Sequence, residues 1–218
     1  MTQPSQTFND AYIANLVASR AGPALGVKPP PYASGRYYAP TFLQPDGVNN
    51  LTTTSTRLYY IPTYIWEAHT FAGFGIYNAG AGDTGETLRL GIYTDSAGKP
   101  GTLAAAGAEI TLGGAAADND GLVSFTPSYI GWYWLAAHFN SAASVRAGNA
   151  PGTRLSDVGY VASAPSFVSF IGALSPSAIQ SGTWPACFYV DTVYGALAST
   201  PVAYTATTGT APMVYLKG

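Results

Sequence analysis

The feature that most constrains the fold is the punctuation of the chain after residue 35. Short runs rich in Tyr, Val, Ile, Thr, Phe and Trp alternate with clusters of Gly, Pro, Asn and Asp. No stretch of ten residues after residue 35 shows the hydrophobic periodicity of a helix. Such runs are typical of antiparallel sandwiches and barrels. We therefore predict one all-β domain, an antiparallel β-sandwich over residues 36–218. Its expected strands are Arg36–Phe42, Arg57–Pro62, Tyr64–Ala68, Phe71–Asn78, Thr87–Thr94, Glu109–Leu112, Leu122–Phe125, Tyr129–Phe139, Ser166–Ile171, Phe188–Val193 and Ala211–Leu216.

Alternation along the run Thr87–Thr94 predicts which of its side chains enter the core. Leu88, Leu90 and Ile92 share one face of the strand, and Arg89 lies on the other. Successive side chains of a strand point to opposite sides of the sheet. We therefore expect the three aliphatic side chains to be buried and the arginine to lie outside the core.

Three clusters of turn residues are expected to reverse the chain. Ser96–Gly101 and Asp118–Gly121 are both rich in residue types that favour tight reversals. Asp118 and Asp120 also have the opening spacing of a calcium loop, but no bidentate Glu closes it and its flanks read as strands. We favour the hairpin turn over an ion site. Asp83–Glu86 is likewise predicted to be a turn before it is a group of ligands.

Aromatic residues are the most suggestive feature for function. The chain has 16 Tyr and 4 Trp, several of them beside turns. An exposed flat ring complements the C–H face of a pyranose, whereas a buried ring packs the core. Alternation places Trp132 and Trp134 on one strand face and Tyr133 on the other, and we expect both tryptophans in the core. Trp66 and Trp184, each beside polar or turn residues, are predicted to be glycan-stacking rings.

Residues 1–35 differ from the rest of the chain and are predicted to form an N-terminal arm. Thr7 and Asp10 resemble a capping box before a short helix, which a Gly-Pro pair at residues 22–23 ends. The segment Gly26–Pro31 is expected to be extended because it carries three consecutive prolines. A helix this short is marginal alone, so its apolar stripe is expected either to dock on a partner or to pack on its own domain. The stripe, predicted to anchor the chain, consists of Tyr12, Ile13, Leu16 and Val17.

Charged residues are scarce, at 9% of the chain, with 9 Lys and Arg, 11 Asp and Glu, and a formal net charge of −2. This composition has no basic footprint for nucleic acid or for an anionic membrane. The sequence MTQPSQTFND at the start lacks the features of a signal peptide. Prolines break the uncharged stretch Val158–Val190, so no membrane insertion is expected. Cys187 is the single cysteine, which excludes a disulfide framework and a Cys-ligated zinc site.

No constellation of residues singles out a catalytic site. A hydrolase needs a nucleophile with its base, paired carboxylates or a set of metal ligands, and no Gly-x-Ser-x-Gly elbow is present. The two histidines, His69 and His138, fall within or beside strand patterns, and we expect both to be hydrogen-bonded strand residues. We therefore predict a protein that is not an enzyme and that uses no cofactor and no metal.

Three motifs within residues 87–139 resemble a module of bacteriophage virion proteins. They are Leu88–Tyr93 (LRLGIY), Gly98–Gly101 (GKPG) and Gly131–Ala136 (GWYWLA). The module recurs in tail-fibre, minor tail and head-decoration proteins of tailed phages. Ile130 stands where the module usually has a proline before Gly-Trp. That departure loosens the turn but leaves the strand intact.

The resemblance implies a jelly-roll-like sandwich that serves as a structural or host-recognition part of a phage particle, without catalysis. We accordingly expect a non-enzymatic virion protein, either a tail fibre or a head fibre or capsid decoration, made in the host cytoplasm. Its arm is expected to bind other virion proteins, and its sandwich to face a glycan of the host surface. By analogy with phage fibres, the expected homo-oligomer is a trimer. The alternatives are a stand-alone carbohydrate-binding module and, least favoured, an enzyme.

Overall fold

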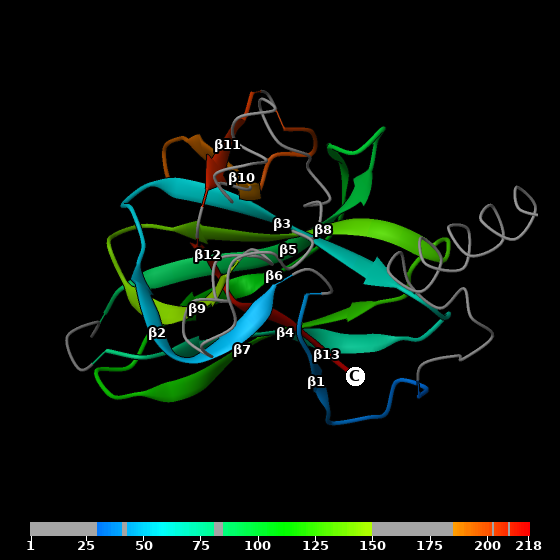
Figure 1. The fold of residues 1–218 in the computed structure, drawn as a ribbon, viewed down its shortest axis with the longest axis horizontal. Helices are drawn as coiled ribbons and strands as arrows, with labels where there is room; N and C mark the ends of the chain where they lie inside the picture. The colour runs from blue at the N-terminus through cyan, green and yellow to red at the C-terminus, as the bar shows by residue number, and fades with distance from the viewer. Residues whose placement is uncertain (1–29, 41–42, 81–84, 150–184, 202, 209) are drawn as a thin grey trace, which may run out of the picture.

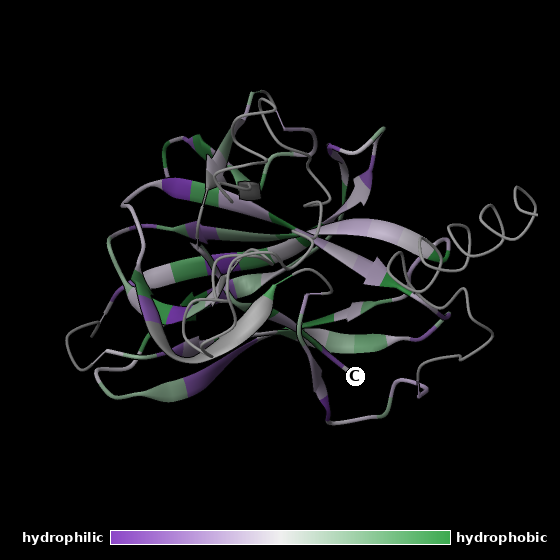
Figure 2. Cartoon of the chain, in the orientation of Figure 1, coloured by the Kyte–Doolittle hydropathy of each residue, from purple (hydrophilic) through white to green (hydrophobic). Residues whose placement is uncertain are grey.

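The computed structural model describes residues 30–40, 43–80, 85–149, 185–201, 203–208 and 210–218. All regular structure within these residues is β, in two antiparallel sheets that form a sandwich (Figure 1). The predicted all-β sandwich is confirmed to this extent, and the predicted arm helix lies outside the described residues. Hydrophilic residues form only short patches on the strands (Figure 2), as expected for a chain with so few charges.

The first sheet has seven strands, of which one lies at the centre. Its strands are β1 (Tyr37–Tyr38), β2 (Gln44–Thr52), β4 (Phe71–Asn78), β7 (Ala117–Phe125), β9 (Ser144–Asn149), β12 (Thr210–Pro212) and β13 (Val214–Lys217). The central strand β4 pairs with β13 and with β7, and its end meets β9 through Asn78 and Val145. β9 in turn pairs with β2 and β12, and β13 pairs with the edge strand β1.

The second sheet has six strands in the order β11-β10-β3-β8-β5-β6. Their bounds are β3 (Arg57–Ile65), β5 (Thr87–Asp95), β6 (Pro100–Thr111), β8 (Gly131–Phe139), β10 (Pro185–Asp191) and β11 (Thr205–Thr208). From β2 to β9 the chain changes sheet at every step except between β5 and β6, which form a hairpin. Sequence neighbours therefore lie across the sandwich, and most strand partners are distant in sequence.

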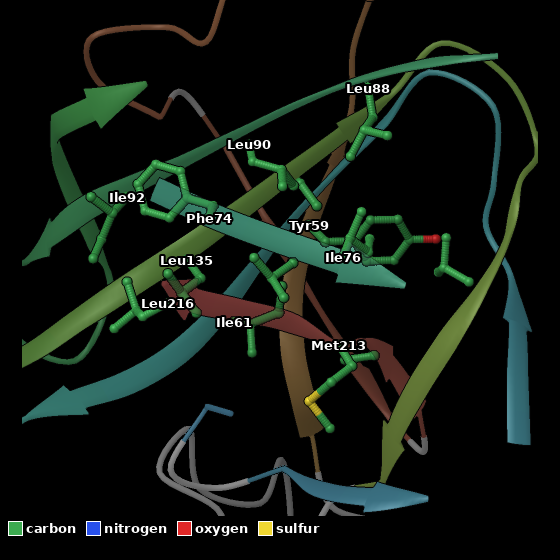
Figure 3. Close-up of a cluster of buried hydrophobic side chains, with 14 of the residues drawn as sticks. Tyr59, Ile61, Phe74, Ile76, Leu88, Leu90, Ile92, Leu135, Met213 and Leu216 are labelled. Carbon is green, nitrogen blue, oxygen red and sulfur yellow. The ribbon is translucent and has the colours of Figure 1, made fainter. Parts of the chain in front are cut away.

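The core lies between the two sheets (Figure 3). Leu88, Leu90 and Ile92 of β5 are fully buried there, as their alternation predicts, and they belong to one cluster with Phe74 and Ile76 of β4. Burying an aliphatic or aromatic side chain of this size stabilises the fold by about 1.5–3 kcal/mol. The apolar face shared by the two sheets is therefore the main source of stability.

Several strands differ from those predicted. β3 joins two predicted runs across Pro62, which lies past the point where β10 pairs with Arg57–Tyr60. Among the described strands, β8 alone pairs with β3 at Pro62, and a proline is tolerated where one side of a strand is unpaired. β6 extends back to Pro100 through a stretch rich in Ala and Gly because it pairs with β5. β2 and β9 were not predicted, because they contain Asn and Gly, which are depleted in strands. β11 was not predicted either, although its Thr residues are common in strands.

One predicted turn is confirmed and another is wrong. Ala97 and Gly98 have positive φ values of 53° and 78°, and the Ser96 N–H donates to the Lys99 carbonyl at 2.8 Å, so the β5–β6 connection is a tight reversal. Asp118–Gly121, in contrast, belongs to β7 and pairs with β4. Backbone hydrogen bonds to β4 outweigh the local turn preference of Asp, Asn and Gly.

Candidate binding surface

Of the predicted site residues, only Trp66 lies within the part of the chain that the structure describes. Those that lie outside the described residues are Tyr12, Ile13, Leu16, Val17 and Trp184. Trp66 is described, in the connection between β3 and β4, where it is half-buried. One face of its indole stacks on the Tyr32 ring, with centroids 3.9 Å apart and planes 22° from parallel. That face is therefore taken by the protein itself.

The last residues of the predicted arm, 30–35, are here called the strap, and they are held firmly at one end of the sandwich. The Tyr32 ring is buried against Trp66 and, at 4.8 Å, Phe71. Its backbone N–H donates to Glu67 Oε1 at 2.7 Å, and the Gly35 N–H donates to the Gly218 carbonyl at 2.7 Å. Packing onto the sandwich therefore begins inside the predicted arm, before residue 36.

The strap offers a direct test. The Tyr32→Ala variant should lose about 3 kcal/mol of unfolding free energy in urea, because a large buried ring leaves a cavity. Tyr32→Phe should change stability by less than about 0.5 kcal/mol, since among the described residues nothing hydrogen-bonds to the Tyr32 hydroxyl. Equal losses in the two variants would contradict ring packing as the cause.

The outer face of the six-stranded sheet carries a second apolar cluster. Trp134 is fully buried there with Tyr60 and Tyr93, under Leu197 of the segment that follows β10. Its predicted burial is confirmed, although it lies outside the space between the sheets. Trp132 is only partly buried, so its predicted place in the core is wrong. It lies near the start of β8, at the end of the sheet, where fewer residues surround it.

His138 lies on the same outer face beside charged residues. Its ring centroid is 5.0 Å from that of Tyr194, and on the neighbouring strand β5 Arg89 pairs with Glu109 at 3.1 Å. Within the described residues neither ring nitrogen has a hydrogen bond of good geometry, but backbone groups of Thr192 and Gly195 lie close enough to act on the ring, so the hydrogen-bonded state stays a prediction. No described group hydrogen-bonds to Nε2 of His69, which lies in a connection rather than in a strand. Burial is the largest influence and lowers the pKa of His138, the backbone groups of Thr192 and Gly195 raise it in part, and the Arg89 guanidinium lowers it.

An exposed tyrosine lies across the outer face of the seven-stranded sheet. Tyr37 is on the edge strand β1, yet its hydroxyl donates to the carboxylate of Asp120 on β7, with Oη 2.9 and 2.7 Å from the two oxygens. The strand order β1-β13-β4-β7 separates the two backbones by three strand spacings, about 14 Å. The side chain must therefore run along the sheet rather than stand off from it.

Gly75 and the Lys217–Asp120 ion pair surround the ring of Tyr37. A Cβ on Gly75 would lie 2.8 Å from Cε1 of Tyr37, so the ring rests against the backbone of β4. Lys217 on β13 forms an ion pair with Asp120, and its Nζ lies 5.3 Å from the centroid of the tyrosine ring. The Asp120 carboxylate raises the pKa of the Lys217 ammonium, which stays charged at neutral pH. The ring is 43% exposed despite these contacts.

We call this surface the tyrosine face. Leu122, 67% exposed, extends it on β7, and the guanidinium of Arg146 lies 5.3 Å from the centroid of the Tyr77 ring. The sequence pattern did not predict this face, although Gly73 and Gly75 share one side of β4 and leave that side bare up to Tyr77. The face comprises Tyr37, Tyr77, Asp120, Leu122, Tyr215 and Lys217.

Comparisons with known proteins assign no family. No protein-family model matches the sequence, and no curated protein matches it. In the described part of the chain, no three His, Cys, Asp or Glu side chains gather in a way that could hold a metal ion. Nor do those residues include a helix long and apolar enough to cross a membrane.

Proposed function

We propose that this chain is a non-enzymatic structural protein of a bacteriophage particle, a tail fibre or a head fibre or capsid decoration. Its arm binds other virion proteins through the stripe at residues 12–17, and its sandwich faces the host surface. It is made in the host cytoplasm and reaches the outside within the virion. By analogy with phage fibres the proposed oligomer is a trimer, which light scattering on the purified chain measures directly.

The observation that carries the proposal is that the three virion-like motifs form one structural unit. LRLGIY lies in β5, GKPG forms the reversal into β6, and GWYWLA lies in β8. β8 pairs directly with β5, from Leu88 opposite Phe139 to Thr94 opposite Tyr133. GWYWLA, which follows GKPG by about 30 residues, thus lies in the same sheet as LRLGIY, which supports reading the motifs as a single module.

We further propose that the sandwich is a jelly roll. The pairing orders β3-β8-β5-β6 and β2-β9-β4-β7 support it. β6 runs close to β7, where a Cβ on Gly107 would lie 3.4 Å from the Gly121 carbonyl oxygen, and β8 returns beside β5. That is the Greek-key order, and a jelly roll contains two such keys.

Immunogold labelling of purified phage particles, with an antibody raised against this chain, tests the proposal. Labelled tails or capsids are expected, and particles without label would contradict it. Deleting residues 1–29 should leave a folded sandwich, since Tyr32 and the strap remain, but the truncated chain should be absent from particles. Incorporation at the normal level would move the anchor from the arm to the sandwich.

A stand-alone carbohydrate-binding module is the second candidate, because the exposed Tyr37 ring is the kind of surface that such modules use. The two candidates differ in one outcome of the labelling experiment. A virion protein labels the particle, whereas a free module is recovered from the supernatant after particles are removed.

A further inference from the structure

We propose that the tyrosine face binds a neutral oligosaccharide, with Tyr37 as the stacking ring. This inference deepens the recognition role in the proposed function and rests on it for its biological setting. It places the glycan site on the seven-stranded sheet, away from Trp66, one face of which is covered by Tyr32.

The ring of Tyr37 extends along the surface of the seven-stranded sheet. A pyranose offers a flat patch of C–H groups, and a partner ring must lie open and parallel to it. Tyr37 runs along the sheet, with Gly75 beside it and Asp120 at its hydroxyl end, while 43% of the residue faces solvent. The ring therefore extends along the sheet from β1 towards β7, with its hydroxyl end fixed at Asp120.

The ring of Tyr37 is held in place in the absence of a ligand. Its hydroxyl is bonded to Asp120, and Asp120 is also bonded to Lys217, so the three side chains of β1, β7 and β13 hold each other. Partial burial and the Asp120 hydrogen bond raise the pKa of Tyr37, so the phenol stays protonated and keeps donating. A ligand that stacks here pays little for ordering side chains.

The charges beside the Tyr37 ring favour a neutral ligand. Asp120 and Lys217 neutralise each other at the end of the ring, so the site offers acceptors and donors without a net charge. Sugar hydroxyls can use both kinds of group, whereas a phosphate or a sulfate needs an excess of cations. Leu122, exposed beside this row through its pairing with Gly73, adds an apolar contact for a second sugar unit.

The test uses the full chain and a panel of neutral hexose oligosaccharides, measured by glycan array and then by calorimetry. At least one member should bind, and Tyr37→Ala should weaken that binding roughly tenfold or more, as loss of a central aromatic anchor does. Gly75→Ala should weaken it as well, because the new methyl group displaces the ring. Tyr37→Phe should lose less than Tyr37→Ala, since the ring remains while the bond to Asp120 is lost.

The matched control is Tyr129→Ala, which removes a tyrosine of similar exposure, 40%, from the connection between β7 and β8. It should bind with unchanged affinity, and thermal melting confirms that each variant is folded. No binding by any sugar, equal binding by Tyr37→Ala, or equal loss in Tyr129→Ala would overturn the inference. So would a fall in oligomer mass on Tyr37→Ala, which would make this face a contact between copies of the chain.

Labelling of virions separates this inference from the proposed function. Labelled particles whose protein binds no sugar would overturn the glycan site and leave the virion role standing. Sugar binding that depends on Tyr37, without any label on particles, would uphold the site and overturn the virion role.

Discussion

Replacing Trp134 with alanine is expected to lower the free energy of unfolding by about 3–5 kcal/mol. The indole is fully buried on the outer face of the six-stranded sheet, its centroid 5.3 Å from that of the Phe188 ring. Its Nε1–H donates to Asp95 Oδ1 at 2.8 Å, so the substitution also removes a hydrogen bond to a carboxylate. Urea unfolding followed by circular dichroism measures the loss.

Val193→Ala is the control for this experiment, because the valine is 88% exposed in the segment that follows β10. It should shift stability by less than about 0.5 kcal/mol. A loss below about 1 kcal/mol for Trp134→Ala would mean that the outer cluster does not unfold together with the sandwich. A full loss would establish this cluster as a second core.

Acidification from pH 7 to pH 5 is expected to destabilise the protein through His138. Its pKa in the folded state is lowered by burial, whereas the unfolded value is about 6.5. The unfolded state therefore binds more protons in this range, and stability falls as the pH drops through the unfolded pKa. One such group contributes at most about 1.4 kcal/mol per pH unit.

Urea unfolding at a series of pH values checks this slope. His138→Gln should flatten it between pH 7 and 5, whereas Val193→Ala, which removes no titratable group, should keep it. The Arg57 guanidinium, with its Nε 2.7 Å from Asp191 Oδ1, lowers the pKa of that carboxyl. The stabilisation that this ion pair contributes is therefore lost at a pH below the range from 7 to 5. An unchanged slope in His138→Gln would assign the acid sensitivity to other groups.

The strap and the tyrosine face adjoin each other along the chain. Residues 30–35 lead directly into β1, which carries Tyr37 and pairs with β13. Before β1, the stacking of Tyr32 on Trp66 holds the strap against the sandwich. Within β1, the hydrogen bond to Asp120 holds the ring of Tyr37. The proposed anchoring stripe at residues 12–17 precedes Tyr37 by 20 residues in the sequence, and the strap is the part of the arm that adjoins the proposed glycan site.

Local pattern was enough to predict a good part of the fold. Phe71–Asn78 forms a strand with the bounds expected from its composition, and the Leu88–Ile92 alternation places the aliphatic residues in the core. The reversal at Ser96–Gly101 is favoured by Gly98, which adopts a positive φ without steric cost. Each of these features depends on residues close together in sequence, so it is visible in one stretch of the chain.

The tertiary structure alone decided which strands are neighbours and what covers their outer faces. Asp118–Gly121 has turn residues but becomes a strand because β4 supplies its hydrogen-bond partners. The tyrosine face joins Tyr37, Asp120 and Lys217 from three distant parts of the chain. Periodicity tells which residues share a face of a strand, but carries no information about the next strand or the cover above it. Those depend on pairing between residues far apart in sequence, which is why the partial burial of Trp132 and the exposure of Tyr37 are visible only in the tertiary structure.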